Sequence, residues 1–131
     1  MFFPYVFVEY AQTVYASTRG DVYSFGIVLL EMIIGRRPTD SILGDELSIV
    51  SYAERNFPDQ VLHIIDAHLH EECKGSNKAI VPTENEAYRC VLSLMQVALA
   101  CTPPLPRERM SMREVGINLH AIRKSYVVAI K

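Results

Sequence analysis

DVYSFGIVLLEMII occupies residues 21–34, and no other segment constrains the architecture as strongly. Apolar side chains lie on nearly every side of a helix drawn through it, and Gly35 follows at a position that commonly ends a helix. A helix that is apolar all round is buried in a core. The composition of 27–30 would also suit a strand, but the segment length and its caps favour a buried helix.

Three segments follow this helix. Leu47–Asn56 has the pattern of a short amphipathic helix that stops before Pro58. Val61–Leu69 holds a brief apolar run, which predicts one or two helical turns. Glu71–Pro82 is polar, and we expect a surface loop there.

Two capping boxes predict two further helices. Thr83–Glu86 opens a helix that runs to about Cys101, and Ser111–Glu114 opens the last helix. Each carries apolar residues at alternating spacings of three and four, which indicates one buried stripe per helix. The first stripe is Ala87, Val91, Leu94, Ala98 and Cys101, and the second is Met112, Val115, Leu119, Ile122 and Tyr126. The expected fold is therefore all-α, with four or five helices and no confident strand.

Composition narrows the class of protein. The chain has 131 residues, the size of one domain, and 50% of them are hydrophobic, which excludes intrinsic disorder. A formal charge of −2 excludes a broadly basic nucleic-acid binder. Three cysteines favour a reducing compartment over a disulfide scaffold. The most apolar stretch, 25–34, is too short to cross a bilayer, so we expect no membrane segment and a chain that is soluble by itself.

Several separated motifs, in a matching order, resemble the eukaryotic protein kinases. Residues 21–32 resemble the Asp-x-Tyr/Trp-Ser-x-Gly segment of that family, and YVFVEY at 5–10 is similar to the end of its activation segment. RRPTD at 36–40, ALACT at 98–102 and PRERMSM at 106–112 are similar to the plant leucine-rich-repeat receptor-like serine/threonine kinases. The resemblance implies that residues 1–131 are a partial kinase domain, from the end of the activation segment to the C-terminal helix.

This resemblance implies a truncated large (C-terminal) lobe in which four to five helices surround a central buried helix. It assigns fold-organising roles to five residues. Asp21 would accept backbone hydrogen bonds from the catalytic loop, and Glu9 would form a buried ion pair with Arg109. Val28 and Met32 would support a stack of apolar side chains beneath the nucleotide, and as part of an all-apolar helix we also expect them in the core.

The chain departs from the family in the motifs that carry out phosphoryl transfer. Phosphoryl transfer needs a phosphate cradle, a lysine, Mg²⁺-binding carboxylates and a catalytic Asp. The sequence has no Gly-x-Gly-x-x-Gly, His-Arg-Asp or Asp-Phe-Gly, and we treat Val-Ala-Ile-Lys at 128–131 as a chance match. Phe7 and Val8 replace Ala-Pro and Pro4 replaces Gly, which argues against peptide docking. We therefore expect no catalytic, cofactor-binding or metal residue in this chain, with ATP and Mg²⁺ expected only for an intact parent kinase.

Other readings of the sequence remain open. His68–Cys73 contains possible metal ligands, but their spacing fits no zinc pattern. The chain could be an interaction module that binds other kinases or protein substrates near Leu47–Phe57, or a truncated or mispredicted gene product without a function of its own. The resemblance implies a cytoplasmic location and a parent at the plasma membrane. In the family a preceding helix covers one side of the 21–34 helix, and this sequence does not contain it. We therefore expect a bare apolar patch on that side, which favours aggregation or partner binding.

Overall fold

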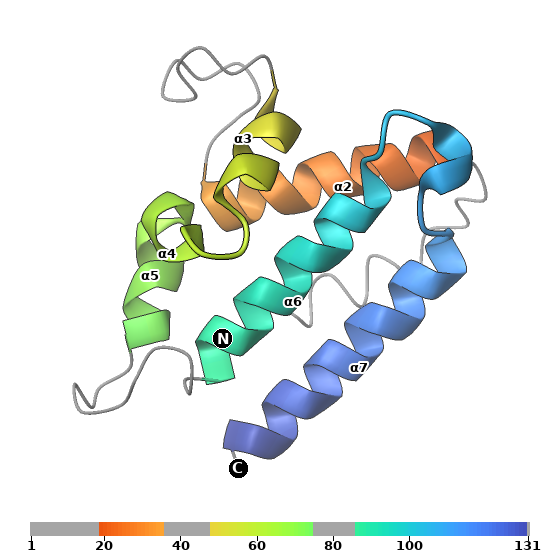
Figure 1. Ribbon diagram of the computed structural model, residues 1–131. Coiled ribbons are helices and arrows are strands. Elements are labelled where there is room, and N and C mark those ends of the chain that lie inside the picture. Colours follow the sequence, from red (N-terminus) through yellow and green to blue (C-terminus); the bar gives the residue numbers. More distant parts are fainter. Residues whose placement is uncertain (1–18, 36–47, 75–85, 131) are drawn as a thin grey trace.

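A computed structural model describes residues 19–35, 48–74 and 86–130 (Figure 1). These residues are helical throughout their regular structure and contain no strand, so the predicted all-α class is confirmed. The elements are α2 (Arg19–Ile34), α3 (Ile49–Asn56), α4 (Val61–Ile64), α5 (Ala67–Lys74), α6 (Glu86–Cys101), the 3₁₀ turn η3 (Pro106–Glu108) and α7 (Met112–Ile130).

Helix α6 lies between α2 and α7, and it also contacts α5 and α3 (Figure 1). Its predicted stripe is confirmed, because all five of its residues are buried. Helix α7 returns antiparallel to α6 (Figure 1). In its stripe Met112, Val115 and Leu119 are buried, while Ile122 and Tyr126 are half-buried against the core.

Helix α2 buries one side of its surface. Phe25, Leu29, Leu30 and Ile33 are at most 1% exposed, and each such side chain contributes about 1.5–3 kcal/mol of hydrophobic burial. The prediction of a buried helix here is confirmed, although it begins two residues earlier than expected. Gly35 ends it with φ +75°, and its N–H donates to the carbonyl of Glu31 at 2.7 Å.

The short helices pack at the C-terminal end of α2. The N-cap of α3 is Ser48, whose hydroxyl accepts from the N–H of Ser51 at 3.1 Å. Asp66 precedes α5, and its carboxylate accepts from the N–H of His68 at 2.8 Å. The N–H of Asp66 donates to the carbonyl of Ile33 at 2.8 Å, which ties the start of α5 to the end of α2.

The predicted surface loop from Glu71 is wrong for residues 71–74, because α5 continues to Lys74. Leu69 and Cys73 lie four positions apart and are both buried. That spacing places them on the same face of a helix, and α5 packs against α6. Tertiary packing therefore outweighs the local polarity that suggested a loop.

The second predicted capping box is confirmed. The hydroxyl of Ser111 accepts from the N–H of Glu114 at 3.1 Å, and the Glu114 carboxylate accepts from the N–H of Ser111 at 3.3 Å. Thr83, which would cap α6, lies outside the described residues. Of the helices that the structure describes, none has the length and apolarity needed to cross a membrane.

Candidate functional site

Arg109 lies at a junction between the start of α2 and the segment that joins α6 to α7. Its guanidinium donates three hydrogen bonds to main-chain carbonyls. Nε donates to Pro103 at 2.8 Å, Nη2 to Pro104 at 3.2 Å and Nη1 to Arg19 at 3.0 Å. The planar guanidinium presents its donors in a fixed fork, so it can hold two separate chain segments at once.

Arg19 and Tyr23 complete this junction from α2. Nη1 of Arg19 donates back to the carbonyl of Arg109 at 2.8 Å. The ring of Tyr23 lies one helical turn after Arg19, and its centroid is 4.6 Å from Cζ of Arg109. The face of an aromatic ring attracts a guanidinium by the cation–π interaction. The Arg109 side chain is therefore held by hydrogen bonds at its edges and by a ring at its face.

The start of α7 adjoins this junction. The N–H of Met110 donates to the carbonyl of Ala100 at 2.9 Å, which fastens the connecting segment to the end of α6. The pKa of Glu114 is lowered, chiefly by the hydroxyl and N–H of Ser111 and further by the charge of Arg19. Glu114 is therefore a charged cap at neutral pH, and its negative charge suits the positive end of α7.

Only one partner of the predicted Glu9–Arg109 ion pair can be examined, because Arg109 is described and Glu9 lies outside the described residues. Within the part of the chain that the structure describes, no carboxylate is within ion-pair distance of Arg109. The ion pair therefore stays a prediction. What the structure adds is the set of carbonyl partners, which sequence reasoning missed because no pattern relates positions 19 and 109.

Asp21 lies in the first turn of α2, as the sequence predicted, and its side chain is exposed. A carboxylate there lies near the positive end of the helix dipole. Its partner in the resemblance, a catalytic loop, corresponds to no segment of this sequence. The organising role of Asp21 therefore stays a prediction.

The expectation that Val28 and Met32 are core residues is wrong. Val28 is 42% exposed and Met32 is 43% exposed, whereas their neighbours Leu29 and Leu30 are fully buried. The two residues are four positions apart, so they share the side of α2 that faces away from α6. No described element covers this side, which agrees with the expected bare and apolar face of the helix.

Gly26 is a structural residue that the sequence analysis did not single out. A Cβ atom at this position would lie 2.6 Å from Cγ2 of Thr102, 2.8 Å from Cβ of Cys101 and 3.0 Å from the carbonyl oxygen of Ala98. Helices α2 and α6 therefore meet at Gly26 more closely than any side chain would permit. A glycine inside an otherwise apolar helix was the available signal.

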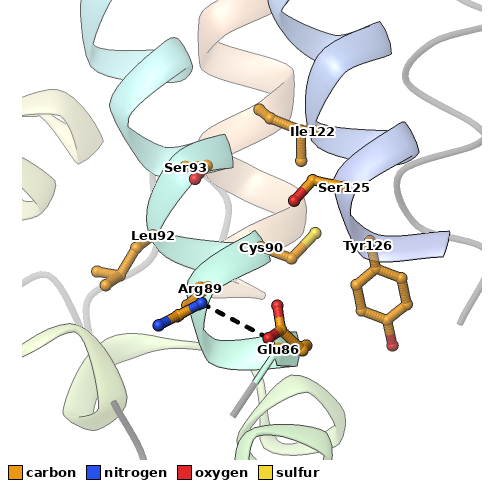
Figure 2. Close-up of a pocket in the computed structure, with 8 residues that line it drawn as sticks. All are labelled: Glu86, Arg89, Cys90, Leu92, Ser93, Ile122, Ser125 and Tyr126. Carbon is orange, nitrogen blue, oxygen red and sulfur yellow. Dashed lines mark ion pairs between the residues drawn. The ribbon is translucent and has the colours of Figure 1, made fainter. Parts of the chain in front are cut away.

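A shallow pocket of about 350 Å³ lies between α6 and α7 (Figure 2). At one end of it Arg89 and Glu86 form an ion pair at 3.6 Å, drawn as a dashed line. Burial raises the pKa of the Cys90 thiol to about 12, so this cysteine stays protonated and unreactive. Cys90 is therefore not an activated nucleophile.

The histidines and cysteine near residue 70 belong to α5 rather than to a loop. Among the residues that the structure describes, no group of three or more His, Cys, Asp or Glu side chains could hold a metal ion. Burial also raises the pKa of Cys73 to about 11. Within the described residues there is therefore no cluster of that size that could hold Mg²⁺.

Comparison of the sequence with known proteins identifies relatives of this chain. No protein-family profile matches the chain. Residues of this chain are 33% identical to the receptor kinase-like protein Xa21 of Oryza sativa subsp. japonica, over 92% of this chain and 12% of that protein. They are 33% identical to the LRR receptor-like serine/threonine-protein kinase GSO1 of Arabidopsis thaliana, over 88% of this chain and 9% of that protein. They are 34% identical to the Arabidopsis MDIS1-interacting receptor like kinase 1, over 85% and 10%.

These relatives are receptor-like kinases, and the all-α fold is consistent with a piece of the large lobe of a kinase. It belongs to the plant leucine-rich-repeat receptor-like serine/threonine kinases, as a fragment of such a kinase. The chain spans about a tenth of the length of the curated relatives that it matches.

Proposed function

We propose that this chain is the part of a receptor-like serine/threonine kinase domain that organises the large lobe, and that it transfers no phosphate by itself. The parent kinase would transfer the γ-phosphate of ATP to serine or threonine of proteins. The observation that carries the proposal is the Arg109 junction, which joins α2 to the α6–α7 connection through main-chain carbonyls. Such a junction holds a scaffold together and offers no group for phosphoryl transfer.

The absence of transfer follows from the residues present. The 131 residues contain none of the motifs that cradle phosphate, hold Mg²⁺ or accept the proton of the substrate hydroxyl. The experiment is a radiolabelled transfer assay with the purified chain, ATP and Mg²⁺. We expect incorporation equal to the blank and no shift in melting temperature with nucleotide. Transfer that disappears when one residue of this chain is changed would refute the proposal.

The fold-organising roles form part of the same proposal. Glu9 pairs with Arg109 and thereby ties the segment before α2 to the junction, and Asp21 positions a catalytic loop in an intact kinase domain. Val28 and Met32 are exposed here, so their supporting role requires residues of a larger domain that cover this side of α2. In the parent receptor this segment would lie on the cytoplasmic side of the plasma membrane.

A second candidate function is a protein-interaction module. The exposure of Val28 and Met32 favours it, because an uncovered apolar face promotes association. The face of α3 that carries Ser51, Glu54 and Arg55 is also exposed, in the region expected to bind other kinases or protein substrates. A pull-down with this chain should recover a partner that Val28→Ser and Met32→Ser together release. Recovery of no partner, or recovery unaffected by these substitutions, would reject this candidate.

A further inference from the structure

A groove of about 360 Å³ lies where the end of α3 meets the end of α6 and the segment that follows α6. The residues that line it are Glu54, Phe57, Leu99, Thr102, Pro103 and Pro104. Four of them are apolar, and the hydroxyl of Thr102 already donates to the carbonyl of Ala98 at 3.1 Å. Glu54 is the only charged residue among those that line it. The groove is therefore mainly apolar and carries a single negative charge.

The wall that Pro103 and Pro104 form is ordered before any partner binds. Each proline ring fixes the φ angle of its own residue. Arg109 donates Nε to the carbonyl of Pro103 at 2.8 Å and Nη2 to that of Pro104 at 3.2 Å, which holds both residues in place. Leu105 follows this wall and is 45% exposed. Because the wall is already fixed, a ligand that enters the groove does not have to order it, and binding costs less conformational entropy.

Glu54 supplies the charge that selects a partner. It is exposed on α3, and no described residue forms an ion pair or hydrogen bond with its carboxylate. Lys and Arg combine an apolar stem, which can lie along an apolar wall, with a cationic end that can reach a carboxylate. An acidic side chain at the same place would be repelled, so the groove distinguishes partners by charge.

We propose that this groove docks a short segment of another protein in which a large apolar residue adjoins Lys or Arg. The apolar side chain lies against Phe57 and the two prolines, and the cation pairs with Glu54. The cavity is at the small end of the range for ligand sites, so it suits individual side chains rather than a whole helix. This inference rests on the second candidate function, the protein-interaction module, and names a docking site and a partner chemistry for it.

The probe for the test is a phage-displayed library of random heptapeptides, selected on the immobilised full chain. Selection should enrich peptides that combine a large apolar residue with an adjacent Lys or Arg. Glu54→Lys should reverse the charge preference, so that the enriched peptides carry Asp or Glu instead. Glu72→Lys makes the same charge change at an exposed position of α5 and should enrich the same peptides as the unmodified chain.

The most enriched peptide, made synthetically, then locates the site. By titration calorimetry it should bind Glu54→Gln about three- to fivefold more weakly, the size expected for one exposed ion pair. Pro104→Ser should also weaken binding, and because Pro104 is exposed the core stays intact. In the ¹⁵N-labelled full chain the peptide should shift the amide signals of Glu54, Phe57 and Leu99 and leave that of Glu72 unchanged.

Enriched peptides without a charge preference, a preference that Glu54→Lys does not reverse, or shifts confined to other residues would overturn the proposal. No enrichment would overturn it as well, and is the result expected if another segment of this chain fills the groove. Groove signals that shift with protein concentration alone would assign the groove to a second copy of the chain and overturn it too. Val28→Ser with Met32→Ser should leave peptide binding unchanged. A pull-down that recovers no partner, while peptides still bind at Glu54, rejects the α2 face and leaves the groove standing.

Discussion

Gly26 of α2 lies against Thr102, the buried residue that follows α6, with room for no side chain between them. The hydroxyl of Thr102 donates to the carbonyl of Ala98 at 3.1 Å, and its methyl group is the atom that a Cβ at position 26 would meet first. This close approach sets how deeply the two principal helices of the core pack together.

Gly26→Ala should therefore destabilise the chain. Alanine gains about 1 kcal/mol of helix propensity over glycine, but overpacking a rigid contact costs about 1–3 kcal/mol. The nearest atoms include a Cβ and a main-chain oxygen, which cannot move aside cheaply. We expect a net loss of up to about 2 kcal/mol in the free energy of unfolding, measured by urea denaturation.

Gly116 provides a matched control in α7, because a Cβ there would meet nothing within 4 Å. Gly116→Ala should stabilise the chain by about 0.5–1 kcal/mol, since only the propensity gain applies. If the two substitutions changed stability in the same direction, the close packing of α2 on α6 would be contradicted.

Arg109→Ala should be costly for a different reason. It removes three charge-assisted hydrogen bonds and the contact with Tyr23. The three carbonyls that accepted those bonds must then be hydrogen-bonded by water. Because the site is only partly buried, we expect a loss of about 2 kcal/mol rather than the sum over the bonds. Arg107→Ala changes an exposed neighbour and should stay within about 0.5 kcal/mol in the same urea titration. Equal effects of the two substitutions would show that the junction contributes nothing.

How much of this molecule the sequence could predict depends on the kind of signal. The α6 stripe from Ala87 to Cys101 was predictable, because its spacing matches the helical period and Pro103 ends it. The capping box of α7 was predictable because Ser111 and Glu114 act locally, three positions apart. Predictions that rest on the residue spacing within a single helix were thus confirmed by the structure.

Features that depend on residues far apart in the sequence could not be predicted. Val28 is as apolar as Leu29, so composition could not show which of them is exposed; only the position of α6 decides this. The hydrogen-bond partners of Arg109 could not be predicted either, because they are main-chain carbonyls, which every residue has. The motif resemblance identified Arg109 as important and predicted Glu9 as its partner, which lies outside the described residues, but it did not predict the carbonyls of Pro103, Pro104 and Arg19.

The lowered pKa of Glu114 makes the α7 cap sensitive to pH. Since its pKa in the folded chain lies below the ordinary value of 4.5, Glu114 contributes stability above that value. The contribution disappears as pH falls through the folded pKa. Melting temperatures of the unmodified chain and of Glu114→Gln should therefore differ at pH 7 and converge in acid below pH 4.5. A difference that stays constant across this range would contradict the charged cap.

The exposed face of α2 predicts association of the isolated chain. Val28→Ser and Met32→Ser together remove apolar surface that no described element covers, so they should reduce self-association in sedimentation velocity with little loss of folding stability. Leu29→Ala, one residue away, should instead cost about 2–5 kcal/mol because that side chain is fully buried. A monodisperse, cooperatively melting monomer in the unmodified chain would contradict the prediction.

The central claim is that the helix carrying the kinase motif is built into the core of an all-α unit, and native-state hydrogen exchange of the full chain tests it most directly. The amides of Leu29, Leu30 and Ile33 in α2 should exchange in the slowest class, together with those of Val91 and Leu94 in α6. If the α2 amides exchange at rates near those of an unfolded chain while α6 stays protected, α2 is not part of the core and the account is contradicted.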